Sequence, residues 1–141
     1  MNEYRFEEIR EGQSESFSRQ ITVEMEDAFR ALSGDENPLH RDDAFAVSVG
    51  EGKFSGHVTF GMLTASLYSA MAGMYLPGKY SLIHSLEIKF QNPVFAGDVL
   101  TVAGTVKRKH EGLNMIELAV KITNQEDKCV SKADMKVLVL R

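Results

Sequence analysis

The residues best suited to chemistry stand close together in the first third of the chain, where Asp35 precedes His40 by five positions. On a continuous α-helix, five residues correspond to about 140° of rotation, so the two side chains would diverge. Pro38 lies between them, and proline interrupts a helix because it lacks a backbone donor and clashes with the preceding turn. We therefore expect an irregular turn, which can bring a carboxylate and an imidazole to one point.

A carboxylate and an imidazole on one turn suit a reaction that moves two protons. When water adds across a C=C bond beside a carbonyl, one group takes a proton from water and another delivers a proton to the α-carbon. Each such general acid or base typically contributes ~10²–10⁴-fold in rate. The spacing alone leaves a second interpretation open, in which Asp35 only forms a turn and His40 is a surface residue.

The other three histidines are weaker candidates. His57 and His110 lie in expected turns, and His84 falls on the apolar face of a predicted strand. A core histidine satisfied by hydrogen bonds is the usual interpretation at such a position. No pair of histidines has metal-ligand spacing with a supporting carboxylate, so we expect no metal. The sequence also lacks a nucleophile elbow, a phosphate-binding loop and a dinucleotide fingerprint.

A second candidate site is the start of a segment that has no charged residue from Val58 to Gly78. We predict a helix over residues 59–76 that is buried in protein on all sides and does not insert into a membrane. The first N–H groups of a helix have no partner within it and lie at the positive end of its dipole. Gly61 in that first turn either lets a ligand carbonyl approach these donors or serves only close packing.

The flanking segments predict an α+β protein with these residues at its helix ends and turns. We expect helices over residues 22–32, with Thr22 as N-cap and Gly34 as the stop, and over 42–49. The period-two pattern predicts strands near residues 13–19, 82–90, 99–108, 113–123 and 129–139. Because the links between the last four are short, the sheet should be antiparallel, and it would bury the uncharged helix by curling around it.

Composition and charge limit the remaining possibilities. The 141 residues are one domain of ordinary size, so we expect a single domain over residues 1–141. The net charge of −4 and the absence of a basic stripe disfavour nucleic-acid binding. Residues 107–110 form a short basic cluster, either a solvated turn or a contact for a phosphate-bearing ligand. A single cysteine, Cys129, and the absence of an apolar leader lead us to expect a cytoplasmic protein.

Two segments together resemble the MaoC-like, (R)-specific enoyl-CoA hydratases of the hot-dog fold. One runs from Ser33 to Asp42 (SGDENPLHRD) and the other from Phe60 to Ser69 (FGMLTASLYS). Residues 76–78 and 90–98 are also similar to the family, and the resemblance extends from about Glu11 to the C-terminus. It implies a long central helix wrapped by a curved antiparallel sheet, and a homodimer whose two sheets join.

The resemblance also implies a role for individual residues. Asp35 and His40 would be the catalytic pair, and the Gly61 N–H would bind the thioester carbonyl. Ser69 would order the Asp35 loop or the pocket, and Asn37 would support the pair. The substrate would be a 2-enoyl or (R)-3-hydroxyacyl thioester of coenzyme A or of an acyl carrier protein, with no further cofactor.

One position departs from the family pattern. Many members have a histidine immediately before the Gly-Met-Leu run, where this chain has Phe60. We expect Phe60 to alter the substrate pocket without removing the proton-transfer pair. Two alternatives stay open: a thioester-binding protein without chemistry, which would need neither Asp35 nor His40, and a hot-dog thioesterase. Thioesterases of this fold place an acid on the long helix, where this chain has none between Val58 and Gly78.

Overall fold

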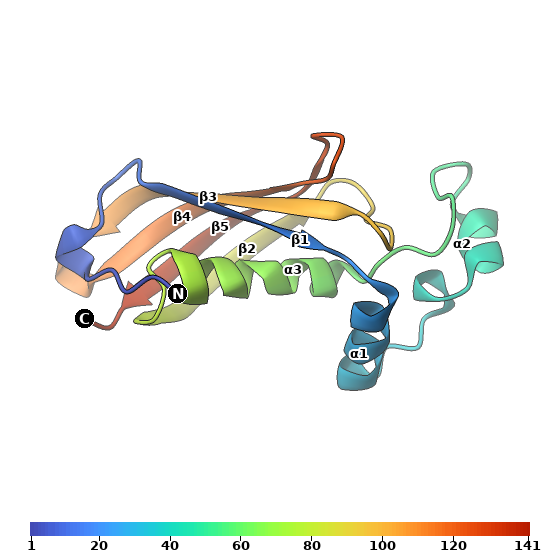
Figure 1. Ribbon diagram of the computed structural model, residues 1–141, viewed down its shortest axis with the longest axis horizontal. Coiled ribbons are helices and arrows are strands. Elements are labelled where there is room, and N and C mark those ends of the chain that lie inside the picture. The colour runs from blue at the N-terminus through green and yellow to red at the C-terminus, as the bar shows by residue number, and fades with distance from the viewer.

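The computed structural model describes residues 1–141, and its largest element is a curved five-stranded antiparallel sheet with the order β1-β3-β4-β5-β2 (Figure 1). The predicted strands are confirmed within a few residues, as β1 Ser14–Gln20, β2 Ser81–Phe90, β3 Val99–His110, β4 Met115–Thr123 and β5 Cys129–Val139. Short turns join β3, β4 and β5, which therefore pair in sequence order. β2 pairs only with β5, so β2 forms an edge of the sheet.

The uncharged segment forms the central helix α3, Gly61–Ala70, which continues as a π-helical turn over Met71–Tyr75. Figure 1 shows α3 lying along one face of the sheet. Tyr68 and Met71 are fully buried in the core between the helix and the strands. A Cβ at Gly104 of β3 would lie 2.9 Å from the Met71 sulfur, so a larger residue there would require the buried Met71 side chain to move.

The helix is covered on one side only. Its sheet-facing residues are buried, but Met62, Ser66 and Ser69 on the opposite side are exposed. The expectation that the helix is buried on all sides is therefore wrong for the single chain, because five strands do not reach around it. No helix in the protein combines the length and the apolar character needed to cross a bilayer.

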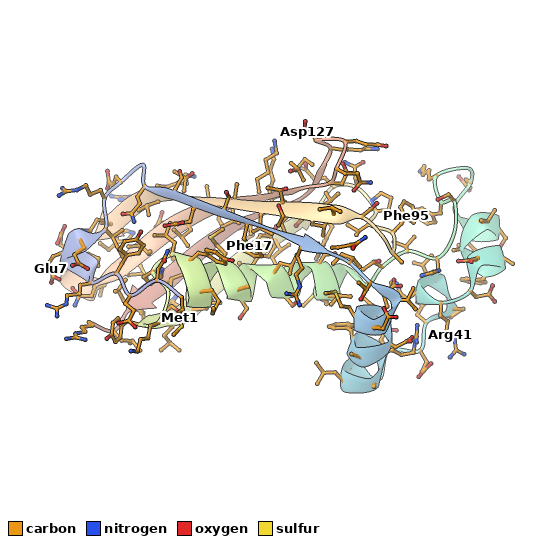
Figure 2. The ribbon with its side chains drawn as sticks, viewed as in Figure 1. Met1, Glu7, Phe17, Arg41, Phe95 and Asp127 are labelled. Carbon is orange, nitrogen blue, oxygen red and sulfur yellow. The ribbon has the colours of Figure 1, made fainter.

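Two further helices lie beyond one end of the sheet, next to the start of α3 (Figure 1). They are α1, Val23–Ser33, and α2, Asp43–Val49, and the 3₁₀ turn η2, Pro38–His40, lies between them. Thr22 caps α1 by accepting from the Met25 N–H at 3.2 Å, and Gly34 ends it at φ 71°, as predicted. Figure 2 shows Arg41 at this end of the molecule and Met1 and Glu7 towards the other.

Two expectations about the strands need correction. His84 is exposed rather than in the core, because β2 is an edge strand and its register shifts between Ile83 and Ser85. All four basic residues 107–110 belong to β3, so His110 ends a strand, where it contacts Glu117 of β4, and does not lie in a turn as expected. The Lys109 ammonium donates to the carbonyls of Phe6 and Ile9 at 2.7 and 2.8 Å and thereby holds the N-terminal turn against the sheet.

Candidate active site

Asp35 and His40 come together on the turn that joins α1 to α2. His40 Nε2 lies 3.8 Å from Asp35 Oδ2, which is too long for a hydrogen bond between them. A water molecule at about 2.8 Å from each atom fits that separation. The His40 side chain is 15% exposed and the Asp35 side chain 45% exposed, so the pair lies at the surface of a hollow rather than deep in the core.

The turn is built by three successive contacts of side chains with the backbone. Ser33 Oγ accepts from the Asp35 N–H at 3.2 Å, and Asp35 Oδ1 accepts from the Asn37 N–H at 3.0 Å. Asn37 Oδ1 in turn accepts from the Leu39 N–H at 2.9 Å and caps η2. These Asx-type contacts stabilise the irregular backbone that Pro38 requires. They also occupy Asp35 Oδ1, which leaves Oδ2 to face His40.

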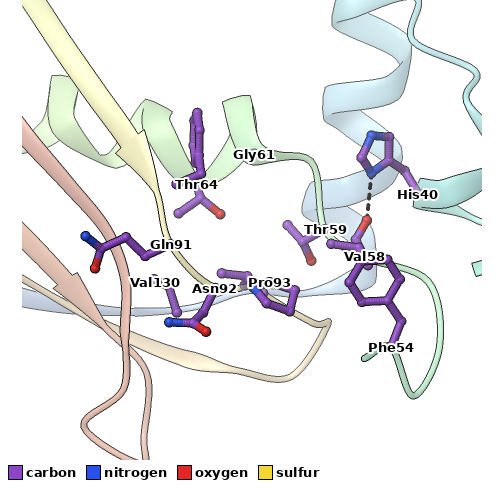
Figure 3. Close-up of a pocket in the computed structure, with 12 residues that line it drawn as sticks. His40, Phe54, Val58, Thr59, Gly61, Thr64, Gln91, Asn92, Pro93 and Val130 are labelled. Carbon is purple, nitrogen blue, oxygen red and sulfur yellow. Dashed lines mark hydrogen bonds between the residues drawn. The ribbon is translucent and has the colours of Figure 1, made fainter. Parts of the chain in front are cut away.

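The orientation of His40 is fixed from the opposite side of its ring. Nδ1 lies 2.7 Å from the Val58 carbonyl oxygen, as Figure 3 shows with a dashed line. A carbonyl can only accept, so Nδ1 carries the proton, and in the neutral ring Nε2 has a free lone pair. The ring also stacks on Phe60, with the ring centroids 4.2 Å apart. Phe60 is 1% exposed and therefore forms a rigid platform under His40.

The first turn of α3 supplies free backbone donors beside the pair. The N–H groups of Leu63 and Thr64 donate to the Phe60 carbonyl, but those of Gly61 and Met62 have no protein acceptor. The positive end of the helix dipole adds to their attraction for an oxygen that carries negative charge.

Two cavities meet at these groups. The Asp35 cavity, about 260 Å³, is lined by Asp35, His40, Phe60, Gly61 and Phe90 among others. The Thr64 cavity, about 310 Å³, also contains His40, Gly61 and Phe90, and extends between Phe54, Thr64 and Val130 (Figure 3). His40, Gly61 and Phe90 line both cavities, so the two cavities adjoin at the imidazole and the first turn of α3. The lining of the Thr64 cavity is mainly apolar, which suits an acyl chain.

A cluster of polar groups that sequence reasoning missed lies on both sides of Val58, the residue whose carbonyl contacts His40. Glu26 of α1 is 1% exposed and contacts His57 and Thr59, and His57 also contacts Asp43 of α2. Burial opposes the charged form of His57, but hydrogen bonds to Glu26 and Asp43 outweigh it and raise the His57 pKa. The His57 backbone and side-chain N–H groups lower the pKa of Asp43.

Comparison with known proteins places the chain in a family. Residues 6–128 match the family described as MaoC like domain. The chain belongs to the MaoC-like family. It is 38% identical over 114 residues to an (R)-specific enoyl-CoA hydratase of Aeromonas caviae, a match that covers 81% of this chain and 83% of that protein.

Two solved structures of hydratases agree with the fold of this MaoC-like chain. An (R)-hydratase from A. caviae involved in PHA biosynthesis has a TM-score of 0.86 and 34% identity, over 93% of this chain and 97% of that one. An R-hydratase from Pseudomonas aeruginosa in the unliganded form has a TM-score of 0.87 and 29% identity, over 96% of this chain and 84% of that one. The predicted hot-dog fold is thereby confirmed.

The structure of this MaoC-like chain brings most of the predicted site residues together. Asp35, His40, Phe60 and Gly61 line one cavity, and Asn37 caps the turn between the first two. Ser69 is exposed, more than two turns further along the helix than Gly61, and lines neither cavity of the single chain. Its predicted role in ordering the Asp35 loop or the pocket stays a prediction.

Proposed function

We propose that the protein interconverts a trans-2-enoyl thioester and an (R)-3-hydroxyacyl thioester by adding or removing water. The observation that carries this proposal is the separation of 3.8 Å between Asp35 Oδ2 and His40 Nε2, in a cavity that also contains Gly61 of α3. The curated relative from A. caviae, an (R)-specific enoyl-CoA hydratase, supports the reaction class and its stereochemistry.

The proposed chemistry uses these three groups together. A water molecule donates one hydrogen bond to Asp35 Oδ2 and one to His40 Nε2, and its oxygen attacks C3 of the enoyl group. As the C3–O bond forms, one of the pair takes a proton from the water, and the pair then delivers that same proton to C2, so that the second proton of the water remains on the new hydroxyl group. The negative charge that develops on the thioester oxygen is stabilised by the Gly61 N–H and the positive end of α3. Dehydration runs through the same steps in reverse.

We also propose that the working enzyme is a homodimer joined along β2. This edge strand has ten residues, is unpaired on its outer side and exposes Leu82, Ile83, Leu86 and Phe90. A long apolar edge of this kind is a template for pairing with another strand. Phe90 and the exposed Met62 both line the Asp35 cavity, so a second copy on this edge would close the open side of the site.

The biological setting follows from the same reaction. Enoyl and 3-hydroxyacyl thioesters are intermediates of fatty acid metabolism, to which we assign the enzyme, with coenzyme A or an acyl carrier protein as the carrier. A cytoplasmic location is our proposal, because a single thiol suits a reducing compartment.

The test is to mix the purified protein with crotonyl-CoA and follow the loss of enoyl-thioester absorbance, then determine the configuration of the product. Formation of (R)-3-hydroxybutyryl-CoA supports the proposal. Tight binding without turnover over a series of chain lengths would favour the non-catalytic binding protein instead. Release of free thiol would favour a thioesterase.

A further inference from the structure

The buried carboxylate of Glu26 has one partner for each of its oxygens. Oε1 lies 3.0 Å from His57 Nε2, and Oε2 accepts from the Thr59 hydroxyl at 2.9 Å. Both partners belong to the segment that leads into α3, and they are the two neighbours of Val58. Glu26 therefore forms hydrogen bonds to the chain on both sides of Val58.

The backbone of Val58 orients His40. The Val58 carbonyl accepts from His40 Nδ1 at 2.7 Å, and the Val58 N–H donates to the Leu39 carbonyl at 2.9 Å. A displacement of the Val58 backbone would break the hydrogen bond from His40 Nδ1 to the Val58 carbonyl, which fixes both the ring plane and the tautomer of His40. The free N–H of Gly61, which we assign to the thioester oxygen, lies three residues further along the same segment.

The contacts of His57 with Glu26 and Asp43 are ionic. His57 Nδ1 lies 2.6 Å from Asp43 Oδ1, so both ring nitrogens face carboxylate oxygens. An imidazole satisfies two such acceptors only as the imidazolium, with each N–H donating. The charged groups facing His57 are Glu26 from α1 and Asp43 from α2. Arg30 of α1 pairs with Asp27.

We propose that Glu26 is a positioning residue for catalysis: it holds the Val58 carbonyl in the place that keeps His40 in the Nδ1–H tautomer with Nε2 towards the substrate. Burying a carboxylate costs free energy unless its oxygens accept hydrogen bonds. Both oxygens of Glu26 contact donors on His57 and Thr59, the residues on either side of Val58. A carboxylate that served only to join α1 to α2 would have no need to contact Thr59. As far as activity is concerned, this inference rests on the proposed hydratase function.

The test compares Glu26→Met, which keeps side-chain length but removes both acceptors, with Glu26→Gln. Glutamine can accept from His57 and donate to the Thr59 oxygen, so it should preserve the hydrogen bonds on both sides of Val58. The matched control is Glu24→Met, because Glu24 is an exposed glutamate on the same helix. We expect Glu26→Met to lower kcat about 10- to 100-fold, by analogy with the loss of the groups that orient histidines at metal sites. KM should change little, and Glu26→Gln and Glu24→Met should stay close to wild type.

The second readout does not depend on turnover. The ¹⁵N spectrum of the imidazoles, assigned to His40 with a His40→Ala variant, reports which ring nitrogen carries the proton. We expect a fixed Nδ1–H tautomer in the wild type and Glu26→Gln, and an averaged tautomer in Glu26→Met. An unchanged His40 signal in folded Glu26→Met would overturn the inference, as would an equal kcat loss in Glu24→Met. If the wild type turned over no enoyl thioester, the hydratase proposal would fail while the spectra still decided the role of Glu26.

A second pair of variants covers the case in which Glu26→Met does not fold. Thr59→Val removes the hydroxyl that donates to Glu26 Oε2, while Thr59→Ser keeps it. We expect the valine variant to lower kcat and average the His40 tautomer, and the serine variant to retain wild-type values for both. Equal behaviour of the two variants would overturn the inference.

Discussion

Replacing Gly61 with alanine should separate stability from activity. The added Cβ would lie 3.3 Å from Phe90 Cε1 and 3.5 Å from its Cδ1 and Cζ. Phe90 is 52% exposed in the single chain, so its ring can move there by the few tenths of an ångström that this contact requires. Alanine is favoured over glycine in a helix by up to about 1 kcal/mol, and compatible replacements stabilise by a similar amount. The free energy of unfolding should therefore stay the same or rise, with an increase in Tm of up to ~4 °C.

Activity should change in the opposite direction. The methyl group and the displaced Phe90 ring would crowd the N–H that we assign to the thioester oxygen. Obstructing one oxyanion donor should lower kcat by about 10²-fold or more, the scale on which such donors act. Thermal unfolding by circular dichroism and initial rates with crotonyl-CoA measure the two effects on the same preparation.

The chain offers a matched control for this replacement. Gly73 lies on the π-helical continuation of α3, where an added Cβ would meet only the Ser81 oxygen, at 3.9 Å. Gly73→Ala should raise Tm by a similar amount, because the same gain in helix propensity applies there, and should leave the rate near wild type. A folded Gly61→Ala protein with a rate within a few fold of wild type would refute the assignment of the Gly61 N–H to the thioester carbonyl.

Three other outcomes are expected. Leu86→Asp places a charge on the exposed edge of β2 and should give a monomer in analytical ultracentrifugation with much reduced activity; an active dimer would contradict the proposed interface. Burial raises the pKa of Tyr68 to about 12, so the neutral hydroxyl donates to Ser131 Oγ at 2.6 Å. Tyr68→Phe should cost about 1 kcal/mol in denaturant unfolding, and no loss would show that this buried bond is not stabilising. Because the His57 pKa is raised on folding, its stabilising contribution is complete below its usual value near 6.5 and is lost as pH rises through the folded value. The stability difference between wild type and His57→Gln should therefore shrink as pH rises, and a difference that grew with pH would contradict the ion pairing.

Sequence patterns over a few residues predicted the features that depend on neighbouring residues alone, namely strand faces, helix ends and one turn. Alternation places Ile116, Leu118 and Ile122 of β4 on one face, and the structure buries all three. Thr22 and Gly34 mark the ends of α1 because capping and left-handed backbone favour their residue types. Proximity of Asp35 and His40 was likewise predictable, since only a short proline-containing turn separates them.

Tertiary contacts decided what local patterns could not predict. Glu26 has the appearance of a helix residue that faces solvent, and only the return of the chain at His57 and Thr59 buries it. The strand β2 has the apolar alternation of a core strand, yet it lies at the edge of the sheet and exposes Leu82 and Leu86. A homodimer interface of the kind proposed for β2 and a core both favour apolar residues, so the sequence of one strand does not distinguish them.

The proton-transfer pair is tested by comparing kcat/KM for crotonyl-CoA hydration in wild type, Asp35→Asn, His40→Ala and the double variant. Asp35→Asn keeps an oxygen to accept from the Asn37 N–H, so the turn should survive. If the two groups act on one water, each single variant should lose about 10²–10⁴-fold and the double variant should lose little more than the worse single. Equal rates for all four proteins would contradict the shared role of Asp35 and His40.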